Sequence, residues 1–196
     1  SHHFTMAEPT STQQIGPWVA ALGAKKPTPG GGAAAAVAAA IGAASGAMAC
    51  IYTTRKKDEE SGVAAGARAL AEELNKAAEK CISIADEDEA AYAALQASWK
   101  DEKMTPEDKA AVEATALDVP VRLVKLCHQQ SAAVVEFLPR CNPNITSDAK
   151  VAIHLLAGAG RAAYQTVLVN KPPAAIDDEL KALLKELAKH EATILE

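Results

Sequence analysis

The sequence has few aromatic residues and almost none of the alternation of β-branched and polar residues that is typical of strands. Phe, Trp and Tyr make up 4% of its 196 residues, whereas 49% of the residues are apolar. Much of the apolar content is alanine, which favours helix strongly. The composition therefore predicts an all-α protein: a single-domain bundle of about six helices, in which small-residue helices pack closely.

An excess of basic residues is also missing. The chain has 20 Lys and Arg against 25 Asp and Glu, which gives a formal net charge of −5. Proteins that bind nucleic acid generally present a basic face. We therefore expect no nucleic-acid partner.

The cysteines and histidines lack the spacing of a metal site. Neither His128 nor His154 has a second ligand at zinc-binding distance along the chain, and no C-x-x-C pair occurs. The four cysteines are far apart: Cys50, Cys81, Cys127 and Cys141. We expect buried or idle thiols in a reducing, cytoplasmic compartment, with no bound metal and no permanently bound cofactor.

The first residues, SHHFTM, resemble the remnant of a tag, and no secretory signal follows them. We expect residues 1–10 to be this remnant and a disordered N-terminus. No internal repeat or linker divides the rest, so residues 11–196 are predicted to form one domain.

A long uncharged segment, KKPTPGGGAAAAVAAAIGAASGAMAC, covers residues 25–50, and no charge occurs between Lys26 and Arg55. A membrane span needs about 20 apolar residues, but alanine and glycine contribute little transfer free energy. We therefore expect a soluble helix packed on all sides, and no membrane partner. Two pairs of glycines have the spacing of four that lets helix backbones approach: Gly42 with Gly46, and Gly62 with Gly66.

Periodicity and chain breakers place the helices. Pro120 is expected to break or kink the fourth helix near Val119. Thr105 is the expected N-cap of that helix, and Thr146 or Ser147 that of the next. The predicted helices cover residues 13–24, 31–54, 62–99, 106–138 and 147–169, followed by a last amphipathic helix around 176–187.

One face of the helix over residues 62–99 carries a single carboxylate. The face consists of Leu70, Leu74, Ala77, Cys81, Ala85, Asp88, Tyr92, Leu95 and Trp99. Burial of an unpaired carboxylate costs several kcal/mol. Asp88 is therefore either paired structurally, which the bare pattern favours, or it acts in a cleft as a base or a counter-ion for a cationic substrate.

The glycine run before the uncharged helix does not fit a P-loop or a Rossmann fingerprint, because the lysine and the preceding strand are missing. Three glycines at a helix start either expose N–H groups to a ligand or form a tight turn with close packing. The spacing leaves both open. Arg55, Lys56 and Lys57 are expected to be a solvated helix end, favoured by the helix dipole.

Together these stretches resemble the cyclodeaminase/cyclohydrolase family, which contains the C-terminal domain of formiminotransferase-cyclodeaminase and free-standing methenyltetrahydrofolate cyclohydrolases. The similarity covers nearly the whole chain after Ser11, and PTPGGG with its alanine-rich helix is the most specific part. The other similar motifs follow in order: Thr53 with Lys56-Lys57, Asp-x-Asp-x-x-x-Tyr (Asp86, Asp88, Tyr92), Asn-x-x-x-x-Ser-Asp (Asn142, Ser147, Asp148), and a helix closing in Val167 and Asn170.

The resemblance implies an all-helical homodimer with a folate groove near the subunit interface. It implies hydrolysis of methenyltetrahydrofolate to formyltetrahydrofolate, or deamination of formiminotetrahydrofolate to methenyltetrahydrofolate, with the tetrahydrofolate derivative as substrate. Asp88 would be the catalytic carboxylate. The substrate-binding residues would be Pro29, Gly30, Gly31, Gly32, Arg55, Lys56, Lys57, Tyr92, Ser147, Asp148 and Asn170, with the basic group holding the anionic glutamate tail.

Three positions depart from the family pattern. Arg55 replaces the usual glycine before the paired lysines, Thr166 replaces the first asparagine of the closing motif, and Ser98-Trp99-Lys100 replaces the usual L-P-K. Two other functions are compatible with these residues: an enzyme of the same fold with a non-folate iminium-like or cyclising substrate, or a non-catalytic helical interaction module.

Overall fold

The described part of the chain is all-helical. The structure, a computed structural model, describes residues 9–195, and these contain seven α-helices and no strand. The elements in chain order are η1 (Thr10–Thr12), α1 (Ile15–Leu22), α2 (Gly31–Ile51), α3 (Lys56–Glu60), α4 (Val63–Lys100), α5 (Pro106–Phe137), η2 (Leu138–Arg140), η3 (Pro143–Ile145), α6 (Thr146–Val169) and α7 (Ala174–Ala192). The predicted all-α fold is confirmed.

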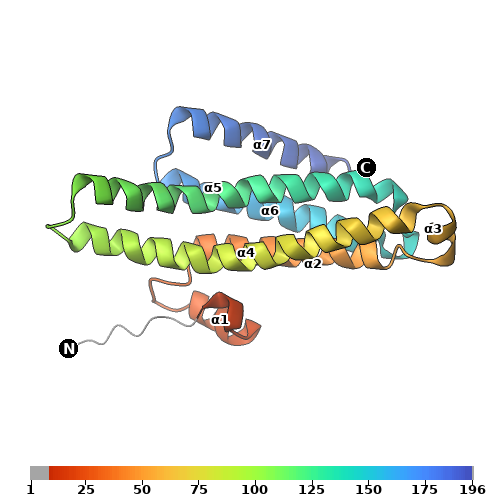
Figure 1. Ribbon diagram of the computed structural model, residues 1–196, viewed down its shortest axis with the longest axis horizontal. Helices are drawn as coiled ribbons and strands as arrows, with labels where there is room; N and C mark the ends of the chain where they lie inside the picture. Colours follow the sequence, from red (N-terminus) through yellow and green to blue (C-terminus); the bar gives the residue numbers. More distant parts are fainter. Residues whose placement is uncertain (1–8, 196) are drawn as a thin grey trace.

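Four long helices, α2, α4, α5 and α6, run side by side along the longest dimension of the molecule (Figure 1). Helix α2 packs against both α4 and α6, and α5 packs against the same two helices. Helix α7 lies against α5 and α6, whereas α1 lies outside the bundle, next to the start of α2 (Figure 1). Helix α2 is thus packed on the faces that meet α4 and α6. It is not packed on all sides as predicted, because Ile41, Met48 and Ile51 on its outer face stay exposed.

Small residues let α2 sit close to its neighbours. A Cβ added at Gly42 would lie 3.0 Å from the Cβ of Leu155 on α6, and one added at Gly46 would lie 3.1 Å from Cγ2 of Val134 on α5. The close approach predicted for this pair is confirmed. By length and composition alone α2 is long and apolar enough to cross a membrane. However, over half of its most apolar stretch is buried inside the molecule, as in the core helix of a soluble protein.

The second pair of glycines does not serve close packing, so that prediction is wrong. Gly62 precedes α4 with φ 78°, a left-handed conformation that glycine adopts without strain. A Cβ added at Gly66 would meet nothing within 4 Å. Spacing alone does not distinguish a helix contact from a turn and an exposed position.

Two helix ends differ from prediction. Helix α2 ends at Ile51 and Lys56 begins α3, so the basic residues do not end the uncharged helix. The side chain of Thr105 accepts a hydrogen bond from the backbone N–H of Asp108 at 3.1 Å, which confirms this cap. The Thr146 hydroxyl instead donates to the Pro143 carbonyl, and Ile145 is the N-cap of α6 without a side-chain bond.

Of the break or kink predicted at Pro120, the break does not occur, because α5 continues through it from Pro106 to Phe137. A proline inside a helix leaves the carbonyl four residues earlier without its N–H partner. Here that carbonyl belongs to Ala116, and the side-chain amide of Asn170 donates to it at 3.0 Å. A residue at the end of α6 thus replaces the hydrogen bond that Pro120 removes.

We expect Asn170→Ala to lower the free energy of unfolding by about 1–3 kcal/mol, since the Ala116 carbonyl loses its side-chain donor. In a Pro120→Ala background the residue at 120 supplies an N–H, so the same Asn170→Ala change should cost less. Denaturant unfolding of the four proteins of this double-mutant cycle measures the coupling. An equal cost of Asn170→Ala in both backgrounds contradicts this role.

The four cysteines are free and buried, as predicted. Burial raises the pKa of the Cys50 and Cys81 thiols to about 12, which keeps them protonated at neutral pH. Within residues 9–195 no group of three or more His, Cys, Asp or Glu side chains is placed to hold a metal ion.

Two consecutive hydrogen bonds through Thr10 connect Trp18 of α1 to Glu89 of α4. The Trp18 indole donates to the Thr10 hydroxyl at 2.8 Å, and this hydroxyl donates to a Glu89 carboxylate oxygen at 2.8 Å. The expectation of a tag remnant and disorder concerns residues 1–8 for the most part, which lie outside the described residues. Thr10 itself begins η1.

Candidate functional site

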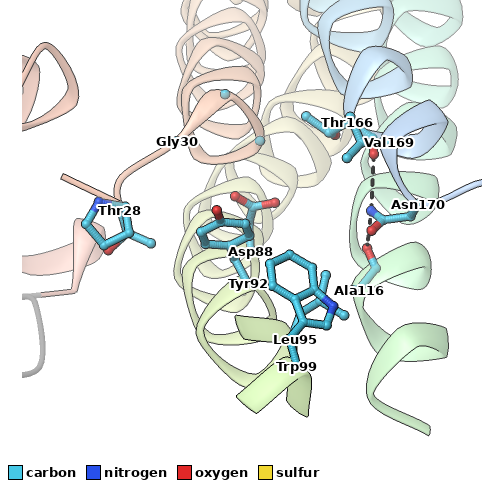
Figure 2. A pocket seen from close by; sticks show the side chains of 13 residues that line it. Thr28, Gly30, Asp88, Tyr92, Leu95, Trp99, Ala116, Thr166, Val169 and Asn170 are labelled. Atoms are coloured by element: carbon cyan, nitrogen blue, oxygen red, sulfur yellow. Dashed lines mark hydrogen bonds between the residues drawn. The ribbon is translucent and has the colours of Figure 1, made fainter. Parts of the chain in front are cut away.

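A cavity of about 320 Å³ opens at the start of α2. Its lining comes from the loop before α2, the first residues of α2, the second half of α4, Ala116 on α5 and the end of α6 (Figure 2). The only charged group among its lining residues is Asp88, and most other lining atoms are apolar. The volume lies at the lower end of the range usual for small-molecule sites.

The apolar face of α4 that runs from Leu70 to Trp99 packs in the core over its first half and lines the cavity over its second half. Leu74, Ala77, Cys81 and Ala85 are buried in the core. Beyond them, Asp88, Tyr92, Leu95 and Trp99 line the cavity instead (Figure 2). Because residues three and four apart share one helix face, a single stripe builds both the core contact and one wall of the site.

Asp88 is half-buried at the N-terminus of α2. Its Oδ2 accepts a hydrogen bond from the backbone N–H of Ala33 at 3.0 Å. Burial raises the pKa of the Asp88 carboxyl above its usual range, the Ala33 N–H opposes this rise, and the charge of Glu89 adds to it. No Lys, Arg or His within residues 9–195 forms an ion pair with it.

The position of Asp88 is compatible with both roles considered for it, a structural partner and a functional group in a cleft. Its contact with a helix terminus is structural, and the partial positive charge there favours the carboxylate. Its position in the cavity wall, without a cation beside it, suits a group that meets a cationic ligand.

Gly32 is required by this contact. A Cβ added at Gly32 would lie 2.1 Å from Oδ1 of Asp88, far inside van der Waals distance. A Cβ added at Gly31 would lie 4.0 Å from Cγ2 of Thr166, and one added at Gly30 would meet nothing within 4 Å. Of the three glycines, Gly32 alone is demanded by close approach, and the other two leave the mouth of the cavity open.

Six of the residues predicted for the site come together in or beside this cavity. Gly30, Gly31, Gly32, Asp88, Tyr92 and Asn170 line it. Pro29 is buried next to it, joined to Thr28 by a cis peptide bond, and does not line it. The Tyr92 hydroxyl accepts a hydrogen bond from the Gln96 amide at 3.2 Å, which orients the ring from the next turn of α4.

The other predicted site residues lie at the opposite end of α2, near α3 at the right of Figure 1. We call this group the α3-end cluster: Arg55, Lys56, Lys57, Ser147 and Asp148. Since 21 residues of helix span about 30 Å, the same chain does not bring this cluster to the cavity. Lys56 and Lys57 are exposed, and Ser147 donates a hydrogen bond to the neighbouring Asp148 carboxylate at 3.1 Å.

Within the α3-end cluster, the Arg55 guanidinium is engaged by protein groups. It contacts the Asp58 carboxylate at 2.6 and 2.8 Å and donates to Oδ1 of Asn142 at 2.6 Å. The hydrogen bond and charge of Arg55 hold the pKa of the Asp58 carboxyl below its usual range. Asn142 also donates to the Tyr52 carbonyl at 2.8 Å, so Arg55 ties the end of α2 to the loop before α6.

A profile of the formiminotransferase-cyclodeaminase family matches residues 14–190. The chain belongs to this family. Its fold is similar to the crystal structure of formiminotetrahydrofolate cyclodeaminase from Thermotoga maritima, with a TM-score of 0.79 and 21% sequence identity over 93% of this chain and 92% of that one. A comparison with curated protein sequences finds no match.

Membership of the formiminotransferase-cyclodeaminase family confirms the resemblance drawn from PTPGGG and the later motifs. The cavity also contains residues that were not predicted as site residues, notably Pro27, Thr28, Leu95, Trp99 and Ala116. Leu95 and Trp99 lie on the stripe that contains Asp88, so periodicity alone could have identified them. No signal in the sequence marked Ala116 as a site residue; its position four residues before Pro120 indicates only a carbonyl that needs a new donor.

Proposed function

We propose that this chain is a tetrahydrofolate one-carbon enzyme that hydrolyses methenyltetrahydrofolate to formyltetrahydrofolate, with Asp88 as its catalytic carboxylate. Deamination of formiminotetrahydrofolate to methenyltetrahydrofolate is the second reaction that this site would support. The observation that carries the proposal is a lone, half-buried carboxylate in an apolar, aromatic cavity of a formiminotransferase-cyclodeaminase family member.

The chemistry fits such a carboxylate. Methenyltetrahydrofolate has a cationic carbon between N5 and N10, and a carboxylate in a low-dielectric site stabilises that cation. Water attacks this carbon, one water proton passes to Asp88, and the bond from the carbon to one nitrogen breaks as that nitrogen takes a proton. A raised pKa brings Asp88 closer to the working pH of a general base, and the bound cation lowers this pKa again.

The deaminase reaction takes place at the same one-carbon centre between N5 and N10 and would use the same carboxylate. N10 attacks the carbon of the protonated formimino group and gives up its proton, the leaving nitrogen takes up a proton, the bond from the carbon to that nitrogen breaks, and ammonia departs. Asp88 would carry that proton. The departures at Thr166 and Trp99 both lie in the cavity, so the choice between the two substrates would be made there.

The test compares the two substrates with purified protein. Loss of methenyltetrahydrofolate absorbance faster than in buffer supports the hydrolase reaction, and release of ammonia from formiminotetrahydrofolate supports the deaminase reaction. If neither substrate reacts while the protein is folded, the one-carbon function is contradicted, and the non-folate enzyme or the interaction module takes its place.

We further propose that the protein works in the cytoplasm as a homodimer, with the folate groove near the interface. Apolar side chains stay exposed on α1 and along the outer face of α2, among them Ile15, Ile41, Met48 and Ile51, and such uncharged surfaces mark interaction sites. The distance of Lys56 and Lys57 from the cavity of their own chain favours a second copy as the source of these lysines. Sedimentation of the detergent-free protein tests the assembly, and a stable monomer contradicts it.

If Lys56 and Lys57 hold the anionic glutamate tail, replacing both with Ala should raise KM and leave kcat near the wild-type value. Exposed charge pairs contribute little, so we expect up to about fivefold in KM for each lysine. The effect should be larger for a polyglutamylated than for a monoglutamylated substrate. Lys185→Ala on α7 is the control, and a fall in kcat at constant KM would argue against tail binding.

A further inference from the structure

Two aromatic side chains that line the cavity are exposed to solvent. Trp99 is 65% exposed and Tyr92 is 38% exposed, although both line the same cavity as Asp88. Figure 2 shows both rings in the space below the glycines, on the side of Asp88 that faces away from α2. Soluble proteins seldom leave large aromatic surfaces in a concave site without a ligand to cover them.

The geometry of α4 brings Trp99 toward Asp88. Side chains on a helix lean toward its N-terminus, so the indole of Trp99 covers the preceding turn, around Leu95. Tyr92 lies seven residues before Trp99 and four after Asp88, on the same stripe. The carboxylate is thus followed along α4 by one aromatic ring and then by a second, larger one.

The rest of this part of the cavity carries no charge. Ala116, Val169 and Thr166 form the wall that α5 and α6 contribute. The Thr166 hydroxyl is used within its own helix, since it donates to the Ala163 carbonyl at 2.7 Å. Asn170 also lines this side of the cavity, and its amide nitrogen donates to the Ala116 and Thr166 carbonyls. An uncharged wall opposite an exposed indole suits a flat aromatic ring.

Within the described part of the chain, Trp99 has no structural contact that would explain a tryptophan at this position. It lies at the second-last position of α4 and outside both buried clusters of the core, and its indole N–H has no hydrogen-bond partner within residues 9–195. The other tryptophan, Trp18, is 6% exposed and donates to Thr10, as a structural tryptophan does. The difference indicates that Trp99 serves a ligand.

We propose that Trp99 is a specificity-determining residue that stacks on the aromatic ring bonded to N10, the nitrogen next to the reacting carbon of the substrate, while Asp88 meets that carbon. The proposal rests on the proposed function for the identity of this ring, which in a folate is the p-aminobenzoyl ring. Trp99 binds and orients the ring and takes no part in proton transfer.

Steady-state kinetics on methenyltetrahydrofolate give the first test. Truncating a stacked ring to alanine typically weakens binding about tenfold or more, so Trp99→Ala should raise KM by about that factor and change kcat far less. Trp99→Phe keeps a ring and should restore most of the affinity. The control is Val151→Ala, which truncates an exposed apolar side chain on a different helix, α6, outside the cavity lining; it should leave KM unchanged.

Calorimetric binding separates this proposal from the proposed function. The wild type and Trp99→Phe should bind p-aminobenzoylglutamate about tenfold or more tightly than Trp99→Ala does, whereas free glutamate should show no such difference. This result stands even if neither folate derivative is turned over. Turnover with an unchanged KM in Trp99→Ala, or no binding of the ring fragment to the wild type, overturns the role of Trp99.

Sedimentation of the same variants tests the remaining explanation for the exposed indole, that Trp99 contacts a second copy of the chain. If Trp99→Ala alters the assembly state while its affinity for p-aminobenzoylglutamate stays at the wild-type value, Trp99 belongs to a contact between copies of the chain. That outcome also overturns the proposal. The exposed position of Trp99 makes loss of folding by Trp99→Ala unexpected, and the Trp99→Phe protein provides the folded reference.

Discussion

A folded Asp88→Asn protein should turn over methenyltetrahydrofolate at least about 10²-fold more slowly than the wild type, since loss of a general base typically costs 10²–10⁴ in rate. The substitution keeps the size of the side chain and an oxygen that accepts the Ala33 N–H. It removes the negative charge that faces the cationic carbon and the basicity that accepts the water proton. The expected result is therefore a kinetic loss in a protein that still folds.

The control for this variant is Asp86→Asn, the same chemical change two residues earlier and outside the cavity lining. It should retain activity. Thermal midpoint and turnover are measured on the same samples. If Asp88 were only a structural partner of α2, Asp88→Asn would instead lower the thermal midpoint and keep its activity per folded molecule, and the base would have to be sought elsewhere.

Gly32→Ala should damage both stability and activity, because its Cβ would be placed 2.1 Å from Oδ1 of Asp88. Either the Asp88 carboxylate moves or the start of α2 shifts away from α4. Overpacking of this kind costs about 1–3 kcal/mol. A displacement of the catalytic group by about 1 Å commonly costs about 10²-fold in rate.

The matched control is Gly66→Ala on α4, where an added Cβ would meet nothing within 4 Å. The same substitution in a helix without a clash should raise stability by about 0.5–1 kcal/mol and leave turnover unchanged. Denaturant unfolding and initial rates of both variants give the comparison. If Gly32→Ala behaves like Gly66→Ala, the contact between Asp88 and the first turn of α2 does not have the importance assigned to it.

Local sequence signals predicted the helices because their causes are local. Alanine content, the stripe from Leu70 to Trp99 and the Thr105 cap each act within a few residues, and the helices they predict form with small errors at their ends. The stripe also identified Asp88 as unusual, since a single carboxylate on an otherwise apolar helix face costs free energy to bury unless a partner or a ligand compensates for it.

Features that depend on distant segments were not accessible in this way. Pro120 predicts a break or a kink. The break is avoided in a helix whose Ala116 carbonyl receives a hydrogen bond from Asn170, fifty residues later in the chain than Pro120. From the residues alone Arg55 was expected at a solvated helix end, and its contacts with Asp58 and Asn142 could not be foreseen because Asn142 is distant in the chain. The family motifs likewise occur in order along the chain, yet the fold divides them between the two ends of α2.

The account depends most on the claim that this cavity performs one-carbon chemistry on a folate. The most direct test is the absorbance decay of methenyltetrahydrofolate in the presence of the purified wild-type protein at neutral pH, measured against buffer alone and over a range of substrate concentrations. We predict a decay that is faster than the spontaneous reaction, saturates with substrate and yields formyltetrahydrofolate. A decay equal to that in buffer, with folded protein and intact substrate, would contradict the claim.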